Sequence, residues 1–310
     1  MLAVFLETLP FFALIGLGYF AGRTGFFPEV ANAYLTKFVF YFALSAMLFR
    51  FSATLAFEDI FDWPYVQIYL TGTFAVWILA FIFALVRAAP IDEAAVEAHS
   101  AVIGNVGFLG IPLLIILFGD AAIGTLMLAL AVDLIVFGSL GVVLITVSRD
   151  GRKSFAVINT VVKGLITNPM IMSVTLGLLW SALELPIPTP LEDFVVTLGS
   201  AATPCALFAI GASLASKTAA RLSVAIWISV CKHVLHPLAI VFAIINWPTA
   251  ISTFSASVMI ACAAMPVAGN VYIIAQHYRV APTRVSASIL VSTLISSLTV
   301  SAAIAWVKTF

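Results

Sequence analysis

The chain of 310 residues is 63% hydrophobic and only 9% charged, and its formal net charge is zero. An ordinary soluble domain carries roughly 25% charged residues, so this composition excludes that class and indicates an integral membrane protein. The absence of a basic surface gives no reason to expect a nucleic-acid partner, and the lipid bilayer is the expected environment. The three cysteines, Cys205, Cys231 and Cys262, lie in apolar segments without metal-ligand spacing, so we expect neither a disulfide framework nor a metal site.

About ten apolar runs follow one another, each long enough for a membrane span of roughly 20 residues. They cover approximately residues 2–21, 30–49, 65–86, 94–118, 121–147, 166–183, 194–214, 222–245, 250–276 and 285–306. Asp92, Glu93 and Asp120 stand where they can cap the fourth and fifth helices. The sequence therefore predicts an all-α integral membrane protein with ten transmembrane helices.

The basic residues fall mainly in alternate connections between these spans. With the first residue outside the cytoplasm, the cytoplasmic connections would hold Arg23, Arg87, Arg149, Arg152, Lys153, Lys163, Lys217, Arg221, Arg279 and Arg284. This asymmetry follows the positive-inside rule. We expect a multi-pass protein of the cell inner (plasma) membrane with both termini periplasmic or extracellular.

The fourth span is interrupted at Gly104-Asn105-Val106-Gly107-Phe108-Leu109-Gly110-Ile111-Pro112. Glycine relaxes a helix, and proline removes a backbone donor and clashes with the preceding turn, so two half-helices with an unwound centre are predicted. Unwound backbone at membrane depth is tolerated only where protein buries it or where it lines a wet cavity. The break is a candidate binding site, and a proline kink filled by neighbouring helices is the alternative.

A second interruption, Met265-Pro266-Val267-Ala268-Gly269-Asn270-Val271, lies in the ninth span. Both interruptions contain Gly-Asn-Val and a proline, but the proline follows the asparagine in the first interruption and precedes it in the second. Paired interruptions in two halves of a chain indicate the binding site of a secondary transporter. Half-helix N-termini suit a small anion, while the opposing C-termini offer carbonyl groups to a cation.

Five spans in each half would place the second half upside down relative to the first, so an inverted repeat is predicted. The first repeat would be residues 1–148, a cytoplasmic connector would cover 149–164, and the second repeat would be 165–310. Helices 4 and 9 would then cross at a similar depth. The residues expected to shape this crossover are Gly104, Gly107, Gly110, Pro112, Pro266 and Gly269.

Four segments together resemble the auxin efflux carrier family: residues 42–49, 104–112, 201–211 and 264–272. The two broken segments are similar to the family's crossing helices, and the other two match its patterns in helices 2 and 7. Ser45 stands where the family often has proline. The resemblance covers essentially the whole chain, and a long central hydrophilic loop is absent, as in bacterial members.

The resemblance implies two inverted five-helix repeats, with a scaffold and a transport domain that move against each other, as in bile acid symporters and sodium/proton antiporters. Family members carry organic anions, including auxin in plants and malonate or related carboxylates in bacteria. Related folds also suggest a homodimer through the scaffold helices 1, 2, 6 and 7.

Polar side chains within the apolar spans identify the candidate binding residues, because a charge at a helix centre costs about 2.5–3.5 kcal/mol. Asn105 and Asn270 can bind a carboxylate oxygen or satisfy backbone groups freed by the breaks. Ser45, Thr203 and Tyr272 are further candidates for substrate binding, and interhelical hydrogen bonding is the alternative for each.

Ion or proton coupling is assigned to Asp133, Lys37 and Lys232. Asp133 can bind a proton or cation, or tether neighbouring helices. The two lysines can attract a carboxylate or extend to an interface. His99 is expected to form interfacial hydrogen bonds, with proton relay as the alternative. No cofactor is expected beyond a coupling ion, and the sequence leaves Na+ and H+ open.

The predicted function is secondary active transport of a small organic anion, an auxin- or malonate-like carboxylate, by elevator-type alternating access. The motif G-x-x-x-x-G-K-[ST] does not occur, so a gradient is the expected energy source. H-E-x-x-H and G-x-S-x-G are also absent, and we do not expect an enzyme. A passive anion channel and a membrane ligand sensor are the alternatives.

Overall fold

The computed structural model describes residues 2–54, 62–150, 159, 162–163, 165–215 and 222–309. Most of the expected connector 149–164 lies outside these ranges. The first half of the chain contains α1 (Leu2–Arg23), α2 (Glu29–Phe38), η1 (Val39–Ala43), α3 (Leu44–Thr54), α5 (Trp63–Val86), α6 (Ile91–Val102), η2 (Val106–Gly110), α7 (Ile111–Phe118), α8 (Ala122–Val132), η3 (Asp133–Phe137) and α9 (Gly138–Asp150).

The second half contains α11 (Pro169–Ala182), α12 (Thr189–Ser200), α13 (Ala202–Ala215), α14 (Leu222–Val230), η4 (Cys231–Leu235), α15 (His236–Asn246), α16 (Thr253–Ala263), α17 (Gly269–His277) and α18 (Pro282–Val307). The η elements are single π-helical turns inside longer helices. Such turns often occur at functional sites.

Within the described ranges, six helical stretches are long and apolar enough to cross a membrane: Glu29–Thr54, Trp63–Val86, Ala122–Ser148, Thr189–Ala215, Leu222–Asn246 and Pro282–Val307. Four shorter apolar helices are Leu9–Arg23, Val106–Phe118, Pro169–Ala182 and Thr253–Ala263. Each stretch falls within or overlaps one of the expected spans. The all-helical, multi-pass class is therefore confirmed, while the inverted repeat stays a prediction.

The expected caps of the fourth and fifth helices are wrong. The N-cap residues of α6 and α8 are Pro90 and Ala121, and neither makes a side-chain cap bond. Asp92 already lies in the first turn of α6, where its carboxylate accepts a hydrogen bond from the Glu93 N–H at 2.9 Å. Acidic groups in a first turn still complement the positive end of the helix dipole.

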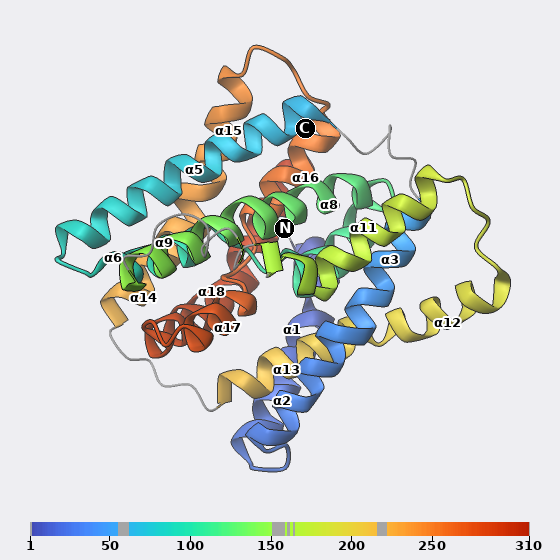
Figure 1. Ribbon diagram of the computed structural model, residues 1–310, viewed down its shortest axis with the longest axis horizontal. Coiled ribbons are helices and arrows are strands. Elements are labelled where there is room, and N and C mark those ends of the chain that lie inside the picture. Colours follow the sequence, from blue (N-terminus) through green and yellow to red (C-terminus); the bar gives the residue numbers. More distant parts are fainter. Residues whose placement is uncertain are drawn as a thin grey trace.

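The helices pack into two groups (Figure 1). We call α1, α2, η1, α3 and α11–α13 the first bundle, which lies toward the lower and right part of the view. The second bundle comprises α5–α9 and α14–α18, with their π turns, and lies toward the left and top. The main contacts between the bundles join α1 to α18 and α7, and α13 to η2.

Close backbone approach holds the first bundle together. A Cβ added at Gly18 of α1 would overlap the Phe208 carbonyl of α13, and one added at Gly211 of α13 would overlap the Ile15 carbonyl of α1. Small residues let transmembrane helices pack at such short distances, which favours van der Waals contact. α1 and α13 are therefore joined closely, although they come from opposite halves of the chain.

Ion pairs tie one end of the second bundle. Arg284 of α18 lies 2.9 Å from Glu93 and 2.6 Å from Glu97, both on α6. Arg87, at the end of α5, also pairs with Glu97, which is only 3% exposed. Removing one partner of a buried ion pair typically costs about 3–5 kcal/mol, because a charge is left uncompensated. The network therefore resists separation of α5, α6 and α18.

Candidate functional site

The two sequence interruptions lie against each other. The Asn105 N–H donates to the Pro266 carbonyl at 2.8 Å, and the Ala268 N–H donates to the Ile103 carbonyl at 3.0 Å. Gly104 and Val267 thus form an isolated antiparallel β-bridge. We call residues 103–105 and 266–268 the bridge. Each break supplies hydrogen-bond partners for the other, as unwound backbone inside a membrane protein requires.

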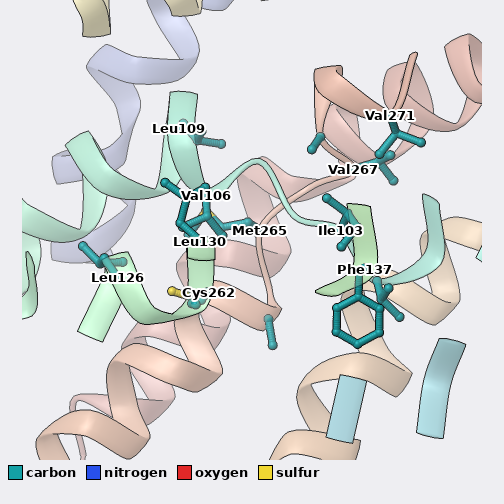
Figure 2. Close-up of a cluster of buried hydrophobic side chains, with 14 of the residues drawn as sticks. Ile103, Val106, Leu109, Leu126, Leu130, Phe137, Cys262, Met265, Val267 and Val271 are labelled. Atoms are coloured by element: carbon teal, nitrogen blue, oxygen red, sulfur yellow. The ribbon is translucent and has the colours of Figure 1, made fainter. Parts of the chain in front are cut away.

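Apolar side chains surround the bridge (Figure 2). Ile103 and Val106 from the first break, Met265 and Val267 from the second, and Leu130 of α8 belong to one buried cluster. None of these side chains is more than marginally exposed. The breaks are therefore buried by protein.

The glycines and prolines of the two breaks occupy different structural positions. Gly104 and Pro266 are part of the bridge, whereas Gly107 and Gly110 belong to η2. Pro112 lies in the first turn of α7, where a missing N–H is tolerated. Gly269 is the first residue of α17.

A cavity of about 210 Å³ lies beside the bridge. Phe40 of η1 and Asn168, the N-cap residue of α11, line it from the first bundle. His99 of α6, Asp133 of η3 and Asn270 of α17 line it from the second. This main cavity therefore lies where the two bundles meet.

A second, smaller cavity of about 20 Å³ reaches the bridge itself. Gly104, Asn105, Asp133 and Asn270 are among its lining residues. Because Asp133 and Asn270 line both spaces, they stand between the bridge and the main cavity. His99 lines only the main cavity, farther from the bridge.

Asp133 is the first residue of the π turn η3 and is only 3% exposed. The hydroxyl group of Tyr69 on α5 donates to its Oδ1 at 3.1 Å. Its other oxygen, Oδ2, is buried and has no hydrogen-bond partner among the residues that the structure describes. Asp133 therefore has one oxygen atom left for a further hydrogen bond.

Lys232 lies within the π turn η4 and is fully buried. Its ammonium group donates to the carbonyl of Ala263, the last residue of α16, at 2.5 Å, and lies 3.0 Å from Nδ1 of His236. A cation at this position complements the negative end of the α16 half-helix. Lys232 lines neither cavity and acts as an internal support for the bridge.

A second polar contact holds the bridge from α18. The Val267 N–H donates to the Ser292 hydroxyl at 3.1 Å, and the Ser292 carbonyl lies 3.0 Å from Nε2 of His233. The other ring nitrogen of His233 is 3.0 Å from the Thr299 hydroxyl. Both polar sides of this imidazole are therefore engaged by α18.

Besides Lys232, four residues proposed from the sequence line neither cavity. Lys37 is exposed, with its ammonium group 5.7 Å from the centroid of the Tyr34 ring. The Ser45 hydroxyl donates to a carbonyl of η1 at 3.1 Å. Thr203 and Tyr272 line neither cavity. The structure thus brings together Asn105, Asn270 and Asp133 from the predicted set.

Sequence reasoning assigned His99 to an interface, but the residue lines the main cavity and is only 3% exposed. Its Nδ1 is buried, and no residue in the described part of the chain forms a hydrogen bond with it. The available signal was its position less than two helical turns before Asn105. Ser139, Asn168 and Tyr278 also line the cavity and had no comparable signal.

Apolar helices of spanning length, two broken helices joined at a buried bridge, and a neighbouring cavity that includes polar side chains are features of integral membrane transport proteins. The chain belongs to the family described as Membrane transport protein (Mem_trans), whose model matches residues 3–304. This is the auxin efflux carrier family that the sequence motifs resemble.

Individual relatives span nearly the whole chain. A Rhizobium meliloti (strain 1021) protein named "Putative malonate transporter" is 30% identical over 295 residues, covering 94% of this chain and 92% of that one. "Uncharacterized transporter YfdV" of Escherichia coli (strain K12) is 27% identical and covers 95% of both chains. The mouse "Lysosomal cholesterol signaling protein" is 25% identical over 69% of this chain, but over only 26% of its own length.

Proposed function

We propose that this transport protein is a secondary active carrier of a small organic anion, specifically a malonate-like carboxylate, working by elevator-type alternating access. The observation that carries the proposal is the main cavity, where His99, Asp133 and Asn270 each have an unpaired buried polar atom. The name of the Rhizobium relative supports malonate as the first substrate to test.

The local backbone supports an anion near Asn270. α17 begins at Gly269, and its N-cap residue, Ala268, makes no side-chain cap bond. A helix N-terminus carries partial positive charge and N–H groups that favour a carboxylate. The amide of Asn270 lies in this first turn and lines both cavities. One carboxylate would therefore be held by the side-chain amide at the positive end of α17.

The division into two bundles supports an elevator motion. The bridge and its supporting residues, Lys232 and Ser292, all belong to the second bundle, so they can move as one body. Across the bundle interface, a Cβ added at Gly107 of η2 would lie 3.1 Å from the Met170 methyl group of α11. In our proposal, this contact slides while the bridge stays intact.

Cross-linking tests that motion. Cysteines at Gly107 and Met170, in a chain without its native cysteines, would be joined by a short bifunctional thiol reagent. We expect cross-linked protein to bind malonate but not to turn over, whereas the two single-cysteine variants treated in the same way keep their flux. Full flux through cross-linked protein would contradict the elevator mechanism.

Our proposal retains the finer arrangement expected from the sequence. Residues 1–148 and 165–310 would be inverted repeats whose broken helices form the crossover. The protein would lie in the inner membrane with both termini outside the cytoplasm, and the first bundle would form any homodimer contact. Asp133 is the residue proposed to couple a proton or a sodium ion. Labelling of single cysteines at each terminus with an impermeant reagent tests the orientation.

A membrane ligand sensor is the second candidate, because the mouse relative is named a signaling protein. A sensor would bind a carboxylate in the same cavity without moving it across the bilayer. A passive channel would conduct without saturation or counterflow. Flux measurements separate these functions.

The direct experiment is uptake of radiolabelled mono- and dicarboxylates by proteoliposomes, with sodium, proton and voltage gradients imposed separately. We expect saturable malonate uptake that responds to one gradient, and empty liposomes provide the background. Binding without flux would favour the sensor. No binding or flux with any carboxylate, for folded protein, would contradict the proposed substrate class.

A further inference from the structure

Three residues that line the main cavity each have a buried polar atom with no hydrogen-bond partner among the described residues: Nδ1 of His99, Oδ2 of Asp133 and Oδ1 of Asn270. His99 and Asp133 are each only 3% exposed, so these atoms are far from bulk solvent. Buried polar atoms are almost always hydrogen-bonded, because an unsatisfied one costs about 1–3 kcal/mol. Their common location indicates where the polar groups of a ligand belong.

The hydrogen-bonding capacities of these side chains restrict the ligand. An asparagine amide offers both an acceptor and donors, and the assignment of its oxygen and nitrogen can be exchanged. A histidine ring nitrogen can also donate or accept. An ionised aspartate can only accept, and Tyr69 already donates to the other oxygen of Asp133. In the ionised form of Asp133, the Oδ2 atom therefore selects a ligand that brings a donor.

A fully ionised dicarboxylate brings no donor. All of its oxygens are acceptors, and a carboxylate beside Asp133 would add a like charge in a poorly solvated place. A dicarboxylic acid that has lost only one proton differs, because it carries one ionised carboxylate and one acid O–H. It can satisfy an amide donor at one end and a carboxylate acceptor at the other.

The order of residues along the two cavities fits such a molecule. Asn270, in the first turn of α17, lines both the space next to the bridge and the main cavity, whereas His99 lines only the main cavity. Asp133 lines both. An acid group bound at Asp133 can therefore also reach toward His99, while the ionised end stays at the N-terminus of α17.

Building on the proposed carboxylate transport, we propose that the site binds a short dicarboxylic acid as its singly protonated monoanion. The acid O–H donates to Oδ2 of Asp133, and Nδ1 of His99 donates to the carbonyl oxygen of the same acid group. The ionised carboxylate accepts hydrogen bonds from Asn270 and the first turn of α17. His99 is thus a substrate-binding residue, and each substrate molecule carries its own proton and one negative charge.

Other titratable groups surround Asp133. They are Tyr65 and Tyr69 on α5, His99 on α6, Lys232 in η4, Cys262 on α16 and Tyr278 after α17. Any test must distinguish the effect of their titration on binding from the effect of the substrate's own ionisation. Malonamate, the monoamide of malonic acid, provides the control. It has one carboxylate and an amide N–H donor that does not ionise, so its binding reports the protein's titration alone.

The experiment is a binding titration of the purified full-length protein with malonate and malonamate, over a pH series that spans the second ionisation of malonic acid. Above that ionisation, we expect the apparent Kd for total malonate to rise about tenfold per pH unit, following the loss of monoanion. The malonamate Kd should change much less. A malonate Kd that stays constant or falls as the dianion forms would overturn the inference while leaving carboxylate binding intact.

Variants at two residues sharpen the test. Asp133→Asn replaces the acceptor with a donor-capable amide, so the pH slope for malonate should disappear because the site can then bind the dianion. His99→Ala should raise the malonate Kd about tenfold. His99→Asn, which retains a nitrogen near the Nδ1 position, should restore most of the affinity.

The outcomes are distinguishable. Unchanged malonate affinity in His99→Ala, or equal losses in His99→Ala and His99→Asn, would overturn the assignment of His99. An unchanged pH slope in folded Asp133→Asn would overturn the assignment of Asp133. Absence of binding by either compound at every pH would contradict the proposed function itself, and this inference with it.

Discussion

The two Gly-Asn-Val sequences stand in different structural roles. In the first break, the Asn105 N–H belongs to the bridge, and the Asn105 carbonyl accepts hydrogen bonds from the N–H groups of Leu109 and Gly110. In the second, Asn270 follows the bridge and lies in the first turn of α17, and its side-chain oxygen has no hydrogen-bond partner among the described residues. The asparagine of the same tripeptide therefore belongs to the bridge in one half and lines both cavities in the other.

The reversed order of proline and asparagine accounts for this difference. Pro266 precedes Asn270, so its carbonyl is available to the bridge before α17 starts. Pro112 follows Asn105 and comes after the π turn η2, in the first turn of α7. Pro266 therefore belongs to the unwound segment of the second break, whereas Pro112 lies within the helical stretch Val106–Phe118 that follows the first.

Loss of the buried ammonium group beside both breaks should have the largest effect. Lys232→Ala leaves the Ala263 carbonyl and the His236 ring without their shared donor, and each unsatisfied group costs about 1–3 kcal/mol. We expect a clearly lower unfolding temperature in detergent and loss of transport. Lys232→Met, which retains most of the volume, should show the same loss. Wild-type stability in both variants would contradict the support role.

Alanine substitutions at one glycine in each break compare how tightly the two breaks are packed. A Cβ added at Gly104 would lie 3.2 Å from the Cys262 carbonyl and from the side chain of Lys232, whereas one added at Gly269 would meet nothing within 4 Å. Gly104→Ala should destabilise by about 1–3 kcal/mol, as overpacking does. Gly269→Ala should unfold at the wild-type temperature. Equal unfolding temperatures of the two variants would show that the bridge is not tightly packed.

Alanine variants of the two asparagines should differ more in their KM for malonate than in their unfolding temperature. Asn270→Ala should raise the KM for malonate tenfold or more, because a hydrogen bond to a charged group is worth about 1.5–3 kcal/mol. Asn105→Ala keeps its backbone bonds and should raise the KM less. Initial uptake rates in proteoliposomes measure both values, with the unfolding temperature as a check on folding. Wild-type KM values in both variants would remove the asparagines from the binding site.

The smallest effect is expected at Pro112. Because alanine can adopt the helical conformation of Pro112 in the first turn of α7, Pro112→Ala should change the unfolding free energy by less than about 1 kcal/mol and leave KM unchanged. Thermal unfolding and uptake measure the two quantities. A large loss of transport would show that Pro112 shapes the bridge directly.

Much of the fold could be predicted from hydrophobic runs, because the bilayer fixes the length and polarity of each span. The breaks could be found because glycine and proline have specific backbone effects. Which side of each helix faces the protein interior could not be predicted. Lys37 and Lys232 are similar in sequence context, yet Lys37 is exposed and Lys232 is fully buried. The π turns η3 and η4, which contain Asp133 and Lys232, have no reliable sequence signal.

The candidate site was predictable where it depended on the breaks themselves. Asn105 and Asn270 line the cavities because they stand next to unwound backbone. His99 lies in a regular part of α6, and its exposure to the cavity depends on which neighbours pack against that face. Such tertiary packing is set by helices far away in the sequence, including α9 and α11.

Counterflow of radiolabelled malonate in proteoliposomes tests the central claim most directly. Vesicles loaded with unlabelled malonate should take up labelled malonate transiently above its equilibrium level. Asn270→Ala should need a higher internal concentration to do so, and empty vesicles should show no accumulation. Equilibration without overshoot for folded wild-type protein that binds malonate would contradict a carrier mechanism.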